Sequence, residues 1–369
     1  MGKILHKLHL YLGLLSALIL MTVATTGAIL SYEKQLLALL HKESFIVEPQ
    51  GSKLSVEELT SRFLMQKPDA KINAISISKA EDASYSITIA SKESRKGENY
   101  YINPYNGKIL PQVTTHNFFK FAENIHRRLL LGEVGKQIVG ASVLILLYLL
   151  FSGVYIYMPK IKRGFVNAMK VNFKAKGRSF LYTLHGAVGL WVIPVYLTIS
   201  LTGLYWSYHW YNELLHNITG IEQHKRVDMK KMGKRAQREE SSIELTKIQK
   251  AFDTFNLEVK NCYKDASLRL PRTGNEYTFI YIDKKPAHPY ARNKFVVDMQ
   301  TMQIKEHERY DDKTFVDKVM HSIFALHSGE YFGWIGQLLF FIAALMMPLI
   351  AITGFMLYLN RRKKHIHEK

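Results

Sequence analysis

The sequence predicts a membrane α-helical protein with α+β outer domains, built from a duplicated helix–domain–helix unit. Three observations lead to this fold class. Four runs without charged residues each exceed the ~20 residues that a helix needs to cross a bilayer. The two long segments between these runs both show a helix followed by short strands. Matching motifs also recur at equal spacing in the two halves of the chain, which indicates an internal repeat.

The composition supports a mixture of membrane helices and water-exposed domains. The 369 residues include 50 Lys+Arg and 31 Asp+Glu, which gives a formal net charge of +19. The hydrophobic fraction of 47% and the mean hydropathy of −0.08 exclude a disordered chain and a chain that lies mostly in lipid. The single cysteine, Cys262, excludes an intramolecular disulfide framework, a Cys-ligated iron–sulfur cluster and a CxxC redox pair.

The charge-free runs define the expected order of elements. They cover residues 8–32, 137–159, 179–212 and 331–360. The expected organisation is a membrane helix at 1–32, an outer domain at 33–133, a membrane helix at 134–158, a basic cytoplasmic loop at 159–179, a membrane helix at 180–206, a second outer domain at 207–332, a membrane helix at 333–359 and a basic cytoplasmic tail at 360–369. The first run could instead be a signal peptide, but its apolar part is long for one and the repeat argues that it is retained.

The short basic segments predict the orientation. Residues 159–180 carry seven Lys or Arg and no acid, and the two chain ends are also basic. In a four-span protein these three segments lie on one side, so the positive-inside rule predicts that both termini are cytoplasmic and both long loops lie outside. The basic segment 225–238 lies on the outer side. It is either a solvated linker or an anion-attracting surface.

Both outer segments show the same order of predicted elements. In the first, residues 55–66 have helical spacing, and strand-like runs follow at 72–78, 84–90 and 98–103. In the second, a helical segment at 243–255 is followed by strand-like runs at 266–270, 277–283 and 294–299. A helix followed by an antiparallel meander is a small α+β unit in which the helix covers one face of the sheet.

The internal repeat selects four histidines. LHLYLGL (8–14) matches LHGAVGL (184–190), and the same number of residues separates His9 from Gly27 and His185 from Gly203. Before the other two spans, IHRRLLLG (125–132) matches LHSGEYFG (326–333). Here His126 and His327 precede equally distant small-residue–glycine pairs, Ser152-Gly153 and Thr353-Gly354. Same-sense repeats of this kind are related by an axis along the membrane normal.

The topology sorts these histidines into two pairs. His9 and His185 begin outward-running helices near the cytoplasmic surface, whereas His126 and His327 precede inward-running helices near the outer surface. Two neutral imidazoles that face each other across the axis are suited to haem iron, so we expect two haem b groups with these four axial ligands. The absence of CxxCH excludes covalent attachment through that motif. Each histidine could instead be a satisfied interfacial residue, and the glycines could serve helix packing alone. Zinc prefers four-ligand sets that include Cys or carboxylate.

Other histidines and aromatic residues are weaker candidates. His321 and His209 are reserve ligands, with His216 beside the latter, and His6 is a neighbour of His9 on the first turn. Five further histidines have no motif context: His41, His116, His224, His288 and His307. Aromatic residues in the spans could line an electron route, although packing or an interface belt is their commoner role: Tyr148, Tyr155, Trp191, Tyr196 and Trp206.

The motifs quoted above, in their order along the chain, resemble the PepSY-associated transmembrane proteins, often named iron-regulated membrane proteins. INPYNGKIL (102–110) is also similar to the closing turn of a PepSY domain, with Asn103 where Asp is usual and Asn106 where Thr is usual. The resemblance implies PepSY-like outer domains, a bacterial inner membrane, and a di-haem ferric-siderophore reductase. It carries the ligand role to His9, His126, His185 and His327.

The expected function is electron transfer from the cytoplasmic side to a periplasmic ferric chelate, such as a ferric siderophore. Bis-imidazole iron has no open coordination position, which favours outer-sphere transfer, and no catalytic side chain is assigned. No Rossmann fingerprint is present, so the electron donor is another protein or a membrane quinol, and no nucleic-acid partner is expected. The alternative is a membrane-anchored regulator whose outer domains bind a partner. Transport is a third interpretation, but no charged residue interrupts the spans.

Overall fold

The computed structural model describes residues 2–91, 97–221, 245–271 and 274–367. The chain divides into two compact units. The helical unit contains Met1–Glu33, His116–Ile221 and Ile323–Lys369, and the sheet unit contains Lys34–Thr115 and Glu222–Ser322. The basic segment 225–238 and His224 lie outside the described residues.

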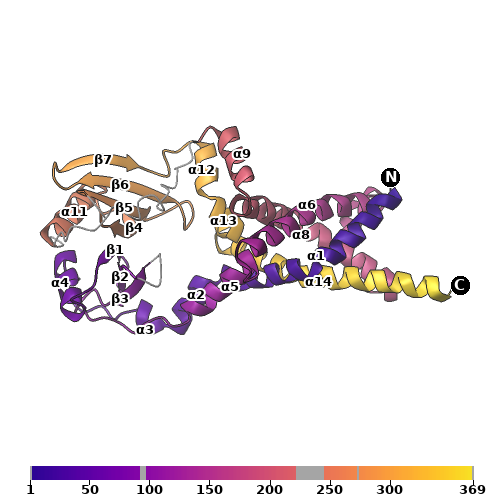
Figure 1. The fold of residues 1–369 in the computed structure, drawn as a ribbon, viewed down its shortest axis with the longest axis horizontal. Helices are drawn as coiled ribbons and strands as arrows, with labels where there is room; N and C mark the ends of the chain where they lie inside the picture. Colours follow the sequence, from indigo (N-terminus) through magenta and orange to yellow (C-terminus); the bar gives the residue numbers. More distant parts are fainter. Residues whose placement is uncertain (1, 92–96, 222–244, 272–273, 368–369) are drawn as a thin grey trace. The chain divides into compact units, whose positions relative to one another are not determined.

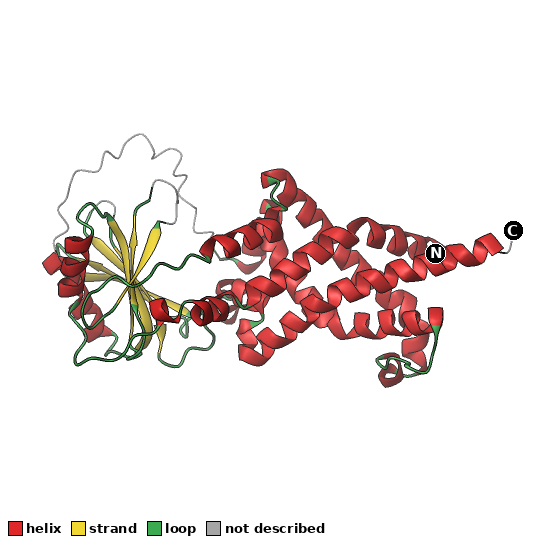
Figure 2. Cartoon of the chain, turned by 90° about the horizontal axis from the view of Figure 1, so that it is seen from below, coloured by secondary structure: helices red, strands yellow, loops and turns green. Residues whose placement is uncertain are grey.

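Four long helices form the helical unit: α1 (Gly2–Ser31), α6 (Gly132–Arg163), α8 (Gly177–Ser207) and α14 (Gly333–His367). Each contains a stretch long and apolar enough to cross a membrane. The predicted membrane-helical architecture is therefore confirmed, and Figure 2 shows these helices running alongside one another.

The long helices pack as a four-membered bundle. α1 packs against α6 and α14, and α8 packs against the same two helices, so α1 and α8 are diagonal to each other. Gln337, near the start of α14, donates a hydrogen bond to the carbonyl of Ser31 at the end of α1, so these neighbours run in opposite directions. An apolar core fills the middle of the bundle: Leu20, Leu146, Val192, Tyr196, Ala343 and Met347.

Two short helices precede the long helices α6 and α14. α5 (His116–Arg128) is separated from α6 by a turn in which Leu129 and Leu130 have φ values of 48° and 62°. α13 (Ile323–Ser328) is separated from α14 by Gly329 at φ 79° and the 3₁₀ turn η1 (Glu330–Phe332). Left-handed backbone ends a helix, so His126 and His327 lie on separate elements from the spans that follow them. α7 (Phe165–Ala168) and α9 (His209–Thr219) complete the unit.

The sheet unit contains one antiparallel sheet of seven strands in the order β3-β2-β1-β4-β5-β6-β7 (Figure 1). The first three strands come from the first outer segment and the other four from the second. Their bounds are β1 (Ile72–Ser78), β2 (Tyr85–Ile89), β3 (Glu98–Ile102), β4 (Tyr263–Arg269), β5 (Glu276–Asp283), β6 (Arg292–Asp298) and β7 (Gln303–Glu308). β7 is a strand that the sequence pattern does not indicate.

β1 and β4 join the two outer segments at the centre of the sheet. They are antiparallel, with Ile75 opposite Leu268. α4 (Val56–Gln66) and α11 (Leu245–Glu258) pack against each other and contribute to the same core as the buried side chains of the strands. The helix-then-meander order is therefore present in both segments, but the two meanders share one sheet and one core. An antiparallel sheet covered on one face in this way buries alternate side chains of each strand.

Short helices occupy the remaining parts of the sheet unit. α2 (Glu33–Leu40) and α3 (Lys42–Phe45) precede the first strands, and α12 (Phe315–His321) follows the last strand. Ser55 caps α4 in a reciprocal capping box with Glu58, which satisfies backbone N–H groups at the start of that helix. Thr314 caps α12 by accepting from the N–H of Asp317.

Candidate functional site

His9 and His185 lie at the bundle end that holds the chain termini, and we call them the termini-side pair. His9, on α1, has its Nδ1 2.7 Å from the hydroxyl of Ser152 on α6. His185, on α8, has its Nδ1 3.1 Å from the carbonyl oxygen of Ile350 and 3.0 Å from the hydroxyl of Thr353, both on α14. Since α1 and α8 are diagonal in the bundle, the two rings come from opposite sides of it.

His126 and His327 lie at the other end of the bundle, where the chain leaves for the sheet unit, and we call them the domain-side pair. The Nδ1 of His126 is 2.8 Å from the carbonyl oxygen of Val23 on α1. The Nδ1 of His327 is 3.0 Å from the hydroxyl of Thr202 on α8. The two ring centroids are 6.3 Å apart and the ring planes are inclined by 73°. The structure therefore brings the predicted outer histidines together.

The hydrogen bonds at Nδ1 define which ring nitrogen carries the proton. A carbonyl oxygen only accepts, so Val23 requires an Nδ1–H on His126 and Ile350 requires one on His185. The hydroxyl of Thr202 donates to the carbonyl of Thr198, so it accepts from His327. In this tautomer Nε2 keeps its lone pair. A histidine ligand in a metal site has the same arrangement, with its other ring N–H donated to a hydroxyl or carbonyl group.

Each ring also lies against a glycine. A Cβ added to Gly27 would be 2.9 Å from Cε1 of His126, and one added to Gly203 would be 3.3 Å from Cε1 of His327. The termini-side pair has the same arrangement, with Gly153 beside His9 and Gly354 beside His185. All four rings are thus held by a small-residue–glycine pair on another helix, where the residue before the glycine supplies a hydroxyl and the glycine supplies space.

Burial keeps the domain-side pair neutral. It lowers the pKa of His126 below its ordinary value. It also lowers the pKa of His327 to about 3, with the neighbouring His126 as a further cause. Removing an imidazolium from water disfavours its charge, and a neutral imidazole is the form that binds a metal.

Some polar groups within the bundle have no hydrogen-bond partner. Among the described residues, the buried hydroxyls of Tyr148 and Ser200 are in this position. A buried polar group without a partner is costly, so each such hydroxyl requires an explanation, of which a bound ligand is one. Trp206 lies beside the domain-side pair, with its ring centroid 5.4 Å from that of His327. Tyr196 lies in the central core and donates to the carbonyl of Ala343 at 2.9 Å.

The reserve histidines lie elsewhere. His321 is exposed and its Nδ1 bonds the carbonyl of Asp317 within its own helix. His209 is exposed and pairs with Glu213 at 3.1 Å. His6 is exposed and bonds Gly2, and His216 contacts Tyr205. None of these four has the paired arrangement of the duplicated histidines.

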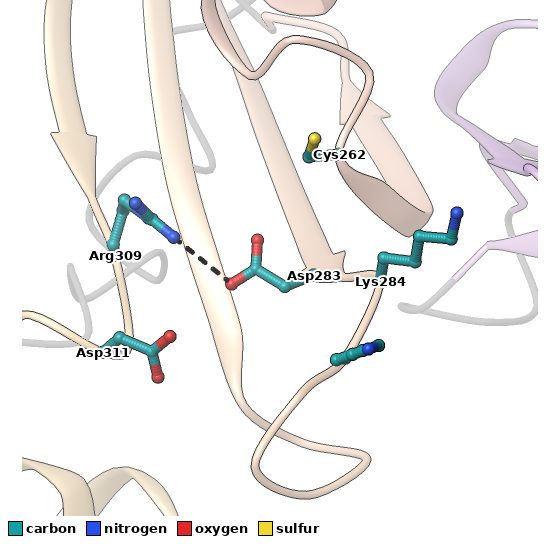
Figure 3. A pocket seen from close by; sticks show the side chains of 6 residues that line it. Cys262, Asp283, Lys284, Arg309 and Asp311 are labelled. Atoms are coloured by element: carbon teal, nitrogen blue, oxygen red, sulfur yellow. Dashed lines mark ion pairs between the residues drawn. The ribbon is translucent and has the colours of Figure 1, made fainter.

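The sheet unit has an open pocket at the ends of β4, β5 and β7 (Figure 3). Its lining residues are Cys262, Asp283, Lys284, Lys285, Arg309 and Asp311. Arg309 is 4.0 Å from Asp283. The pocket therefore has mixed charge. Within the described residues, neither this pocket nor any other place brings together three His, Cys, Asp or Glu side chains that could hold a metal ion, so a zinc site of the usual protein-ligand type does not appear there.

Sequence reasoning selected the four duplicated histidines as candidates but did not anticipate the groups that bond them. The hydroxyl groups that bond three of the rings belong to Ser152, Thr202 and Thr353. Each of these residues directly precedes a glycine at an equivalent position of the repeat, and this pattern could have indicated that its side chain bonds a histidine. The carbonyls of Val23 and Ile350 have no signal in the sequence, because any residue supplies a carbonyl group.

Comparisons with known proteins and protein families indicate the family of this chain. A comparison with curated proteins gave no match. The family model for the PepSY-associated TM region matches residues 6–361, which include all of α6 and α8, most of α1 and α14, and both segments that form the sheet unit. The chain therefore belongs to the PepSY-associated transmembrane family.

Proposed function

We propose that this protein binds two b-type haems and carries electrons across a bacterial inner membrane to reduce a ferric chelate, such as a ferric siderophore, on the periplasmic side. The observation that carries the proposal is the set of four duplicated histidines. They form one pair at each end of the bundle, and their Nδ1 atoms bond hydroxyl or carbonyl groups.

The domain-side pair fits bis-imidazole ligation in its dimensions. Two imidazoles whose nitrogens each lie about 2 Å from a shared metal have ring centroids roughly 6 Å apart. His126 and His327 have centroids 6.3 Å apart. Haem would supply a one-electron Fe(III)/Fe(II) couple without an open coordination position.

The chain's own residues would orient the ligands and exclude water. Hydroxyls and carbonyls fix the imidazole planes and raise the basicity of the ligating nitrogen. Gly27 and Gly203 let the rings approach the helices closely. The apolar core around Tyr196 and Met347 lies between the two pairs and would keep water out of the middle of the bundle. The acceptor would lose its iron after reduction, because hard oxygen ligands bind Fe(II) more weakly than Fe(III).

The direction of transfer follows from the expected orientation. The basic segments at both termini and at 159–180 favour the cytoplasmic side for the termini-side pair. The domain-side pair would then face the periplasm. Fused to the C-terminus, a reporter enzyme that functions only in the cytoplasm should be active, and one that functions only in the periplasm should be inactive. The opposite result would reverse the predicted orientation.

Proteoliposomes test the function directly. Protein is inserted into vesicles, a ferric chelate is trapped inside with a ferrous-specific dye, and a membrane-impermeant reductant is added outside. We expect ferrous iron inside protein-containing vesicles and none in protein-free vesicles. Equal ferrous iron in both would contradict the proposal. Purified protein without haem would favour the alternative, a membrane regulator whose sheet unit binds a partner.

A further inference from the structure

Two buried histidines of the sheet unit belong to neither predicted pair. His41 is 9% exposed and His288 is 3% exposed. Both bond a hydroxyl residue at the point where the chain leaves the sheet unit. Thr115 is the last residue before α5, which carries His126, and Ser322 is the last residue before α13, which carries His327.

The cluster around His288 is a triangle of hydrogen-bonding groups, in which the Ser322 hydroxyl also donates to the carbonyl of Lys318. Its Nε2 lies 2.8 Å from the Ser322 hydroxyl and 3.0 Å from the Tyr310 hydroxyl, and those two hydroxyls are 2.9 Å apart. The backbone N–H of Tyr290 donates to Nδ1 of His288, so the ring proton is on Nε2 and points into the triangle. His288, Tyr310 and Ser322 are each no more than 3% exposed.

The triangle joins three separate parts of the sheet unit. His288 belongs to the loop between β5 and β6, Tyr310 follows β7, and Ser322 ends α12. Leaving any of these buried groups without a partner is costly, so the bonds favour keeping the three parts together. Ser322, the last residue of the sheet unit before α13, is thereby bonded to the β5–β6 loop and to the segment after β7.

The first repeat has a smaller version of this arrangement. Nε2 of His41 lies 2.7 Å from the hydroxyl of Thr115, and the hydroxyl of Ser44 donates to the carbonyl of Pro111 at 2.8 Å. These bonds join the segment that arrives from α1 to the segment that continues into α5. α5 packs against α1 and α6, and α13 packs against α8.

We infer that His41 and His288 are positioning residues for the domain-side pair, and that they couple the sheet unit to His126 and His327. The part of the inference that concerns haem rests on the proposed function. The His288 triangle has more bonds, and the short helix α13 places His327 close to it in the chain. Loss of the His288 triangle should therefore change the position of His327 more than loss of the His41 contact changes the position of His126.

The decisive variant is Tyr310→Phe, which removes one hydroxyl and little volume. Its matched control is Tyr281→Phe, because the Tyr281 hydroxyl also bonds a histidine in the sheet unit, His307, at 2.8 Å, but lies on neither exit segment. Amide hydrogen exchange of the whole protein in detergent is the first readout, and it needs no cofactor. Tyr310→Phe should raise exchange in residues 323–328 about tenfold, and Tyr281→Phe should leave it unchanged.

The second readout is the low-temperature electron paramagnetic resonance spectrum of the oxidised haems. Tyr310→Phe and His288→Asn should shift the signal that is lost in a His327→Ala variant and leave the other signal in place. A merely destabilised protein would alter both. If His288→Asn does not fold, Tyr310→Phe decides alone.

The outcomes separate this inference from the proposed function. Unchanged exchange in 323–328 for Tyr310→Phe overturns the inference, even in a protein with two haems. Equal acceleration in Tyr281→Phe also overturns it. Faster exchange in 323–328 of a protein that binds no haem supports the coupling and overturns the proposed function instead.

Discussion

The two histidine pairs are equivalent in the repeat but differ in how the fold supports them. His9 and His185 lie within the long helices α1 and α8, so the bundle alone fixes them. His126 and His327 lie on the short helices α5 and α13, which left-handed turns separate from the following spans. The termini-side pair therefore depends on helix packing, whereas the domain-side pair also depends on the connections to the sheet unit. The same local arrangement, a hydroxyl residue followed by glycine, thus holds rings on long helices in one pair and on short helices in the other.

The largest expected effect comes from removing one ligand of each pair. His327→Ala should remove only the domain-side haem and His185→Ala only the termini-side haem, so each variant keeps about one haem per chain. Transfer across vesicles should be lost in both, because one haem leaves most of the ~30 Å hydrocarbon core unspanned. Haem assays and vesicle assays measure this. Loss of both haems in a folded single variant would show that the pairs are not independent.

A smaller effect should follow from filling the space beside a ring. Gly27→Ala places a Cβ 2.9 Å from Cε1 of His126, so the ring must move and domain-side haem occupancy should fall several-fold. Gly189→Ala is the matched control within the bundle, because a Cβ there has nothing within 4 Å. Haem per chain and thermal stability are measured together. Equal haem loss in both variants would point to general destabilisation.

Removing one hydroxyl should tune a haem without releasing it. Thr202→Val leaves the Nδ1–H of His327 without its hydroxyl acceptor, which makes the imidazole less basic and should raise the midpoint potential of the domain-side haem. A loss of about 1 kcal/mol corresponds to roughly 40 mV for one electron. Thr353→Val should do the same at His185, with a shift of similar size, because each histidine keeps a backbone carbonyl partner, Ile350 for His185 and Ile199 for His327. Redox titration compares them; a fall in potential would contradict the assigned tautomer.

The smallest effect is expected in the pocket of the sheet unit. Cys262 is exposed and lies in neither pair. Cys262→Ser should leave haem content, spectra and potentials unchanged, as measured on the purified variant. A spectral change would mean that the thiol contacts a cofactor and that the ligand set is incomplete.

The sequence was most informative where a physical constraint repeats along the chain. The four spans could be predicted from the length of the apolar runs and their lack of charged residues. Strands β1 to β6 could be predicted from their short strand-like runs of alternating apolar and polar residues. Equal spacing gives the pairs, because duplicated segments occupy equivalent places in the bundle. The pairing of β1 with β4 could not be predicted, since either meander could have formed its own sheet. β7 was also hidden, because QIKEHE has few apolar residues and lies at a sheet edge.

The supports of the pairs were less accessible to sequence reasoning. The break between α5 and α6 contains Leu129 and Leu130 in left-handed backbone, which leucine rarely adopts, so the sequence gives little sign of it. The buried roles of His41 and His288 depend on contacts with Thr115 and Ser322, which are distant in the chain. Such contacts follow from the tertiary fold and have no local motif.

The most direct test of the central claim is a haem count on the purified wild-type protein, combined with a redox titration. A pyridine haemochrome assay should give about two b-type haems per chain, and the titration should resolve two one-electron steps. Each step should disappear in one of the two variants, His185→Ala or His327→Ala. A ratio well below one haem per folded chain, or unchanged haem content in both variants, would contradict the assignment of these four histidines.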